Sequence, residues 1–96
     1  MKAQIYNYSI WLEETNPAVL KETLTDALAA AGFNVLEITE HHFTPHGYTA
    51  LWLLSESHLA VHTFPEHNST YLELSSCIDK PFNSFITAIN KTNDTH

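Results

Sequence analysis

The sequence contains no arginine and few basic residues of any kind. It has four lysines and eleven Asp and Glu residues, which gives a formal net charge of −7 at pH 7. Nucleic acids bind proteins mainly through Lys and Arg contacts with phosphates, so we expect no nucleic-acid partner. Without a guanidinium group, no bidentate clamp for a substrate carboxylate or phosphate is available. The acidic balance instead favours a cationic small molecule as ligand.

Cysteine and long apolar segments are also scarce. The single cysteine, Cys77, cannot form an intramolecular disulfide, which favours a reducing, intracellular setting. The N-terminus lacks a signal-peptide pattern, and the longest apolar run falls far short of the roughly 20 residues that a membrane-spanning helix needs. We therefore expect a cytoplasmic protein without a membrane segment.

The chain is nevertheless apolar enough to fold. Hydrophobic residues make up 44% and aromatic residues 11% of its 96 positions, which indicates a globular rather than a disordered protein. A chain of this length suits one domain over residues 1–96 and buries about two thirds of its unfolded surface. Many apolar side chains on a small sheet favour covering one face by forming a homodimer.

Apolar periodicity predicts two helices and about five strands. Alternating β-branched and aromatic residues favour a first strand over residues 4–13. A helix follows, capped by Asn16, begun by Pro17 and ended by Gly32. Its apolar face comprises Leu20, Leu24, Ala27, Leu28 and Ala31. The remaining expected elements are strands at 33–40, 48–54, 58–63 and 70–77, a loop at 41–47, and a second amphipathic helix at about 81–91.

This order predicts an α+β fold, a two-layer sandwich in which two helices cover one face of a mainly antiparallel sheet. The other face then needs a partner, and a second copy of the chain is the simplest one. The run from residue 50 to residue 54 is continuously apolar, which is typical of a strand buried on both faces or of a short buried segment.

A dense polar cluster comes directly after that run. Residues 55–66 place hydroxyls, imidazoles and carboxylates against an apolar strand end, where burying them without use costs free energy. Taken singly, each has an ordinary explanation: Ser57 and Glu66 suit turns, and a lone cysteine is often a small buried hydrophobe. Alternatively, Cys77 and His62 could form a thiol nucleophile and its base.

Histidine is unusually frequent, with seven residues in so short a chain. His41, His42 and His46 lie near one turn, and imidazole is a common zinc ligand. Adjacent histidines on an extended chain point to opposite sides, however, and no CxxC or HExxH pattern accompanies them. We therefore favour solvated loop histidines and expect no metal.

Read as a unit, the cluster closely resembles the short prokaryotic form of S-adenosylmethionine decarboxylase, a pyruvoyl-dependent enzyme of polyamine synthesis. The resemblance rests on Leu54-Ser55-Glu56-Ser57-His58-Leu59, His62-Thr63-Phe64-Pro65-Glu66 and Cys77, and upstream on His42-Phe43-Thr44-Pro45-His46-Gly47-Tyr48-Thr49-Ala50. It spans about residues 33–77 at unbroken spacing. Thr49 stands where the family usually has serine, Phe64 where tryptophan is common, and Ile78 where the family has glycine after its cysteine. We also expect the family's last strand to be absent.

The resemblance implies that the chain cuts itself between Glu56 and Ser57. The Ser57 hydroxyl would attack the preceding carbonyl, form an ester and, after β-elimination, become an N-terminal pyruvoyl group, the covalent cofactor. By the same likeness, His62 would assist the elimination and Thr49 would stabilise the ester-forming intermediate.

The resemblance also implies roles in turnover. The pyruvoyl ketone would form a Schiff base with the substrate amine and withdraw electrons as carbon dioxide leaves. Cys77, a thiol with an ordinary pKa near ~8.5, would then protonate the carbanion. Phe43 and His62 would flank the adenine ring, and Glu66 would bind the ribose hydroxyls.

The sequence thus predicts a homodimeric decarboxylase of S-adenosylmethionine that serves spermidine synthesis. Two alternatives remain open. A pyruvoyl enzyme of this kind can accept ornithine or arginine, both of which are cations that an acidic site tolerates. An uncut homologue would instead act as a non-catalytic binding or regulatory subunit.

Overall fold

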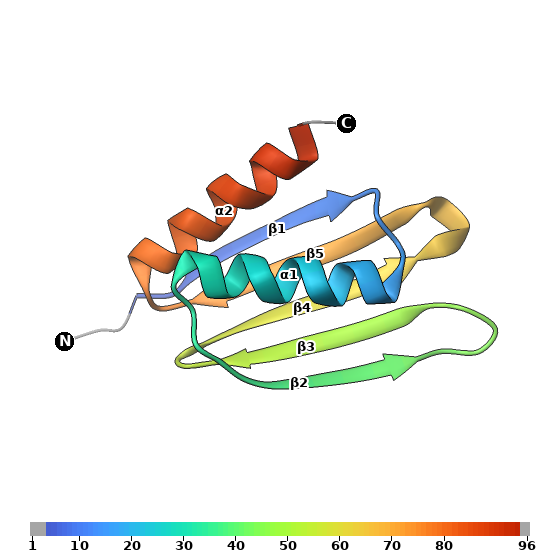
Figure 1. The fold of residues 1–96 in the computed structure, drawn as a ribbon, viewed down its shortest axis with the longest axis horizontal. Helices are drawn as coiled ribbons and strands as arrows, with labels where there is room; N and C mark the ends of the chain where they lie inside the picture. The colour runs from blue at the N-terminus through green and yellow to red at the C-terminus, as the bar shows by residue number, and fades with distance from the viewer. Residues whose placement is uncertain (1–3, 95–96) are drawn as a thin grey trace.

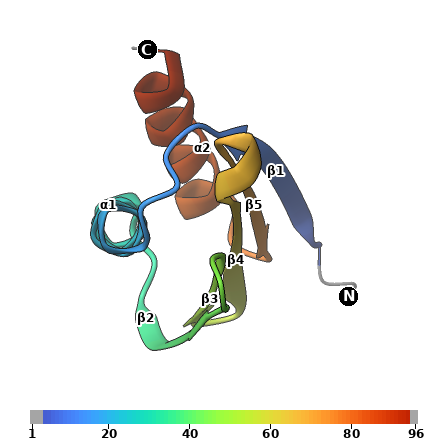
Figure 2. The ribbon, with the colours of Figure 1, turned by 90° about the vertical axis from the view of Figure 1, so that its right-hand side faces the viewer.

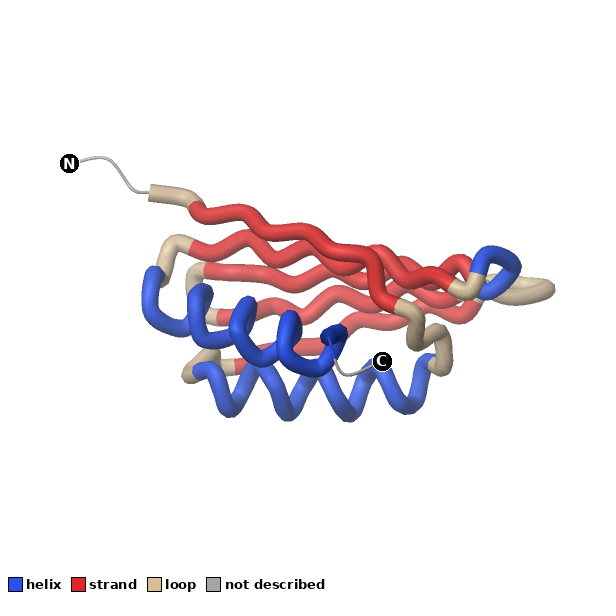
Figure 3. The backbone as a smooth tube through the Cα atoms, turned by 90° about the horizontal axis from the view of Figure 1, so that it is seen from above, coloured by secondary structure: helices blue, strands red, loops and turns tan. Residues whose placement is uncertain are grey.

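Five strands form one antiparallel sheet, and both helices lie on the same side of it (Figure 1, Figure 3). The computed structural model describes residues 4–94. In chain order the elements are β1 (Tyr6–Leu12), α1 (Pro17–Ala31), β2 (Val35–His42), β3 (Tyr48–Leu54), β4 (Ser57–Phe64), the short 3-10 helix η1 (Pro65–His67), β5 (Ser69–Ser76) and α2 (Asp79–Asp94). The spatial order β1-β5-β4-β3-β2 confirms the predicted α+β sandwich.

The largest difference from the predicted elements is at the end of β2. The sequence predicts a strand that stops at residue 40 and a loop over 41–47, but β2 continues through His42. His41 and His42 pair with Thr49 and Tyr48 on β3, so the hairpin is longer and its loop shorter than expected. Cross-strand hydrogen bonding outweighed the turn signal of the nearby proline and glycine. Helix α2 also begins earlier than predicted, at Asp79.

Helix α1 begins and ends where its capping residues predict. The Asn16 side chain accepts hydrogen bonds from the backbone N–H groups of Ala18 and Val19, at 2.9 and 3.2 Å. Gly32 ends the helix in the left-handed region, with φ of 104°, and its N–H bonds the carbonyl of Ala29. The helix therefore buries its predicted leucines against the sheet: Leu20, Leu24 and Leu28.

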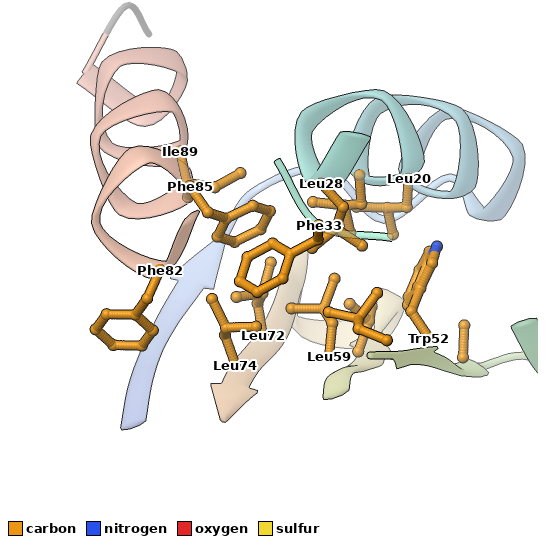
Figure 4. Packing of buried hydrophobic residues seen from close by; sticks show 14 of the residues in the cluster. Leu20, Leu28, Phe33, Trp52, Leu59, Leu72, Leu74, Phe82, Phe85 and Ile89 are labelled. Atoms are coloured by element: carbon orange, nitrogen blue, oxygen red, sulfur yellow. The ribbon is translucent and has the colours of Figure 1, made fainter. Parts of the chain in front are cut away.

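The core lies between the sheet and the two helices. Figure 4 shows Trp52, Leu59, Leu72 and Leu74 rising from the sheet toward Phe85 of α2 and the leucines of α1. The indole Nε1 of Trp52 donates a hydrogen bond to Thr25 Oγ1 at 2.9 Å, which satisfies a polar atom inside this apolar layer. The core thus fixes the helices to the strands that carry the polar cluster.

The face of the sheet away from the helices is uncovered, as Figure 2 shows. We call it the open face; its large apolar side chains are Trp11, Leu51, Leu53 and Phe64. Leu51 and Leu53 are 46% and 49% exposed, whereas their neighbour Trp52 on the opposite face is fully buried. Within one chain, the apolar run of β3 is therefore buried on one face only, because strand side chains alternate between faces. No helix within residues 4–94 is long and apolar enough to cross a membrane.

Candidate active site

The turn between β3 and β4 holds the most unusual backbone near the polar cluster. Ser55 and Glu56 connect the strands, and Glu56 has a φ of 61°, in the left-handed region that non-glycine residues rarely adopt. Such a conformation costs roughly 1–2 kcal/mol for an L-residue. The strained residue directly precedes the Glu56–Ser57 peptide bond, so backbone strain lies next to the bond that the family resemblance marks for cleavage.

Ser57 opens β4 with its side chain on the buried side of the sheet. The residue is 8% exposed, and its Oγ donates a hydrogen bond to Oγ of Ser76 at 2.8 Å. Ser57 and Ser76 are direct partners in the β4–β5 ladder, so backbone pairing brings the two hydroxyls together. The hydroxyl proposed as nucleophile is thus held in one place by a buried contact.

Cys77 lies on the other side of the same peptide unit, immediately after β5. Its Sγ donates to the backbone carbonyl oxygen of Glu56 at 3.1 Å and lies 3.6 Å from the carboxylate Oε2 of the same residue. Loss of solvent around the thiol raises the pKa of Cys77, and the adjacent Glu56 carboxylate raises it further. The thiol therefore stays protonated at neutral pH and can act as a hydrogen-bond or proton donor.

A second cluster forms around Thr49 and His62, which are neighbours across β3 and β4. Thr49 Oγ1 and His62 Nδ1 lie 3.0 Å apart, at hydrogen-bond distance. Both side chains lie on the open face. The two residues expected to assist cleavage therefore contact each other.

The same cluster opens into a pocket of about 270 Å³, and the three residues expected to bind substrate, Phe43, His62 and Glu66, all line it. Glu66 Oε1 lies 3.6 Å from Nε2 of His46, which also lines the pocket. Thr63 contributes a buried hydroxyl that makes no hydrogen bond within residues 4–94. Aromatic rings, a carboxylate and a free hydroxyl suit a flat heterocycle that carries hydroxyl groups.

The two clusters lie at opposite ends of the sheet. His62 follows Ser57 by five residues on one strand, which corresponds to about 16 Å. An odd separation also puts their side chains on opposite faces. Within one chain, His62 therefore lies neither beside Ser57 nor beside Cys77, which contacts Glu56 at the Ser57 end of the sheet. The role expected for His62 in cleavage stays a prediction.

The histidines of the β2–β3 hairpin are spread over both faces. The ring of His41 packs against Phe43 with centroids 4.4 Å apart, and the ring of His42 packs against Tyr48 at 4.8 Å. Across the part of the chain that the structure describes, no three His, Cys, Asp or Glu side chains are grouped closely enough to hold a metal ion.

Ser76 is the residue that sequence reasoning missed. It contacts Ser57 directly and is 1% exposed. The sequence does carry a hint of its role. In the alternating pattern of β5, position 76 falls among the buried residues, where an apolar side chain is expected, but it holds a serine. A polar group at a buried position needs a partner, and the structure shows that this partner is Ser57.

Known proteins share both the sequence pattern and the fold. The family model described as S-adenosylmethionine decarboxylase matches residues 12–92. S-adenosylmethionine decarboxylase proenzymes are 38% identical over 61 residues in Oceanobacillus iheyensis and 41% identical over 63 residues in Prochlorococcus marinus. These matches cover 64% and 66% of this chain but 48% and 50% of the relatives, so the chain spans about half their length.

A longer match reaches S-adenosylmethionine decarboxylase proenzyme 2 of Bacillus cereus, which is 37% identical over 86 residues and covers 80% of this chain and 66% of the relative. The crystal structure of the adenosylmethionine decarboxylase from Aquifex aeolicus has the same fold, with a TM-score of 0.72 at 24% identity over 94% of this chain and 83% of that one. Because the family model matches most of its length, this chain belongs to the S-adenosylmethionine decarboxylase family.

Proposed function

We propose that this protein is a self-cleaving, pyruvoyl-dependent decarboxylase that acts on S-adenosylmethionine and serves spermidine synthesis. The observation that carries the proposal is the peptide unit between Glu56 and Ser57. A strained residue precedes a buried serine, and the Cys77 thiol donates to the carbonyl oxygen between them. The relatives named proenzymes support a chain that must be cut before it acts.

Self-cleavage would begin with an acyl shift at this peptide unit. Ser57 Oγ attacks the carbonyl carbon of Glu56, a carbon–oxygen bond forms, the carbon–nitrogen bond breaks, and the hydroxyl proton passes to the freed Ser57 nitrogen. Negative charge develops on the carbonyl oxygen, where the Cys77 thiol already donates at 3.1 Å. Breaking the peptide bond also releases the strain stored at Glu56.

The ester would then break by elimination. A base removes the Cα proton of Ser57, and the Glu56 carboxylate leaves from Cβ. Water hydrolyses the product, ammonia departs, and the former Ser57 becomes a pyruvoyl group at the start of β4. Ser76 and Cys77 flank that position, so the residues present fit such a group. Once formed, it supplies an electron sink for decarboxylation.

The base for this step comes, in our proposal, from a second copy of the chain. His62 and Thr49 lie at the opposite end of the sheet from Ser57. We propose that two copies pack open face against open face, related by a two-fold axis perpendicular to the strands. This symmetry reverses the strand direction of the second sheet, so the Ser57 end of each sheet lies against the Thr49 end of the other. Half-exposed Leu51 and Leu53 supply apolar surface for such packing. A homodimer would therefore contain two composite sites.

Substrate choice follows from the pocket beside Thr49. Phe43 and His62 provide aromatic surfaces for adenine, and Glu66 provides a carboxylate for the ribose hydroxyls. The positive sulfonium suits a chain with a formal charge of −7. Ornithine and arginine have no ring for the aromatic walls to contact, so we propose S-adenosylmethionine as the substrate. The protonated Cys77 thiol would then return a proton to the decarboxylated carbon.

Release of labelled carbon dioxide tests this assignment. Purified cleaved protein is incubated with carboxyl-labelled S-adenosylmethionine, ornithine or arginine. We expect release from S-adenosylmethionine alone. Clear turnover of ornithine or arginine with none of S-adenosylmethionine would contradict the substrate assignment, and no turnover of any of them by fully cleaved protein would favour a non-catalytic subunit.

A further inference from the structure

Ser76 is the most buried polar side chain beside the proposed cleavage site, and it takes no part in the bonds made or broken there. The residue is 1% exposed. Its Oγ accepts a hydrogen bond from Ser57 Oγ at 2.8 Å and another from the backbone N–H of Ile78 at 3.0 Å. Its own hydroxyl donates to the backbone carbonyl of Ile78 at 3.4 Å. Ser76 is thus held by the backbone at the end of β5.

These three contacts favour Ser57 as the donor in the hydrogen bond between the two serines. A serine hydroxyl has one hydrogen to donate and two lone pairs to accept with. The Ser57 hydroxyl donates to Ser76 Oγ at 2.8 Å, and the Ile78 carbonyl oxygen, 3.4 Å from Ser76 Oγ, lies on the side toward which the Ser76 hydrogen can turn. With its hydrogen directed at Ser76, Ser57 keeps its own lone pairs available for attack.

We propose that Ser76 is a positioning residue for self-cleavage, one that fixes the rotation of the Ser57 side chain; this inference rests on the proposed function. Ser76 and Cys77 are consecutive, so their side chains leave the end of β5 on opposite faces. Ser76 holds the attacking hydroxyl and Cys77 holds the carbonyl oxygen under attack. Two adjacent residues therefore orient both partners of the acyl shift, in which the Ser57 proton finally moves to the Ser57 nitrogen.

A purely structural pairing of two buried hydroxyls makes a different prediction. Removing the Ser76 hydroxyl would then lower stability, as the loss of any buried hydrogen bond does, without a selective effect on cleavage. Thr70 offers a matched control because its hydroxyl is buried on the same strand and donates to the carbonyl of Glu14, at the far end from Ser57. Thr70→Ala loses a comparable bond, but Thr70 lies on the buried face of β5 with Leu72 and Leu74, away from both Ser57 and the open face.

The test follows cleavage in full-length chains. Parent, Ser76→Ala, Ser76→Cys, Ser76→Thr and Thr70→Ala proteins are refolded from denaturant under reducing conditions, and cut chain is measured over time by intact mass. We expect Ser76→Ala and Ser76→Cys to cleave about tenfold more slowly than the parent or worse, because alanine offers no acceptor and sulfur a weak one. Ser76→Thr should stay within about threefold of the parent, because it keeps the hydroxyl. Thr70→Ala should cleave at the parent rate.

The outcomes distinguish a wrong role for Ser76 from a wrong assignment of self-cleavage. If the parent cleaves and both Ser76→Ala and Ser76→Cys match its rate, the positioning role is wrong while the proposed function stands. Equal slowing by Thr70→Ala would likewise overturn it, because loss of stability alone would then explain the effect. If Ser76→Ala fails to fold, the cleavage rate of Ser76→Cys tests the positioning role instead, because cysteine keeps the side-chain volume. A parent chain that never cleaves contradicts the proposed function itself.

Discussion

At the scale of single residues, the chemistry that we propose is concentrated on one peptide unit. Glu56 is held in the left-handed region, Ser57 is buried behind it, and the Cys77 thiol reaches the carbonyl between them. These residues were expected from the sequence because their spacing resembles a family pattern. Ser76 was not expected. The family resemblance includes Cys77 but not Ser76, and nothing in the sequence pattern pairs Ser76 with Ser57, 19 positions earlier.

Substitutions at Ser57 and Cys77 should separate cleavage from turnover. Ser57→Ala removes the nucleophile, so we expect the chain to stay uncut. Cys77→Ser keeps a donor near the Glu56 carbonyl, so cleavage should persist. Decarboxylation should fall about a hundredfold or more, because an alcohol is a much weaker acid than a thiol. Intact mass and carbon dioxide release measure the two effects; a fully active Cys77→Ser protein would contradict the proton-donor assignment.

The environment of Cys77 makes a separate prediction about pH. In a Ser57→Ala chain, which we expect to stay uncut, the pH profile of iodoacetamide alkylation should give a thiol pKa above the ordinary value of ~8.5. Adding Glu56→Gln should lower that pKa, because the carboxylate near Sγ is lost. The pKa of Cys77 is higher in the folded chain than in the unfolded chain, so the protonated thiol contributes fully to stability at pH values below the unfolded-state pKa. This contribution is lost as the pH rises through the folded-state pKa. Alkylation with an ordinary or lowered pKa would contradict the observed contacts.

At the scale of elements, local signals predicted α1 well and β2 poorly. Asn16, Pro17 and Gly32 act within one turn of the chain, so the sequence alone shows where α1 begins and ends. The end of β2 depends on pairing with β3, a tertiary contact that overrode the turn signal beyond residue 40. The Thr49–His62 contact likewise depends on the register between β3 and β4, which no local pattern determines.

Changes at the ends of α1 should measure what its caps contribute. We expect Asn16→Ala to lower the free energy of unfolding by about 1 kcal/mol, because two backbone N–H groups lose their acceptor. Gly32→Ala should cost about 1 kcal/mol through its φ alone, since an added Cβ meets Pro81 at an ordinary 3.7 Å. Urea denaturation measures both, with exposed Glu22→Gln as a control that should change little. Unchanged stability in both variants would contradict the capping account.

At the scale of the whole molecule, the two groups of residues that we propose for the site do not meet within one chain. One end of the sheet carries Ser57, the proposed nucleophile, and the other end carries His62 and the pocket. The open face between them exposes Leu51 and Leu53. The sequence predicted both sets of residues and a homodimer. It did not predict that they lie at opposite ends, because the distance between them becomes visible only once the strands are paired.

Mixing two inactive chains should test the proposed composite site. Ser57→Ala and His62→Ala chains, carrying different tags, are each expected to remain largely uncut when produced alone. Produced together, they should form mixed dimers in which Ser57 of the His62→Ala chain meets His62 of the other chain. We therefore expect cleavage of the His62→Ala chain only, measured by intact mass of each tagged species. No cleavage in mixed dimers would contradict a site shared between two chains.

We propose above all that the chain cuts itself at the turn between β3 and β4 and converts Ser57 into its cofactor. Intact-mass measurement of the purified parent protein is the sharpest test of this proposal. We expect two fragments, residues 1–56 and residues 57–96. The second should be lighter than a serine-initiated fragment by the mass of one ammonia and should be blocked to amine-reactive reagents at its N-terminus. A single full-length species that persists on incubation would show that the chain does not cut itself.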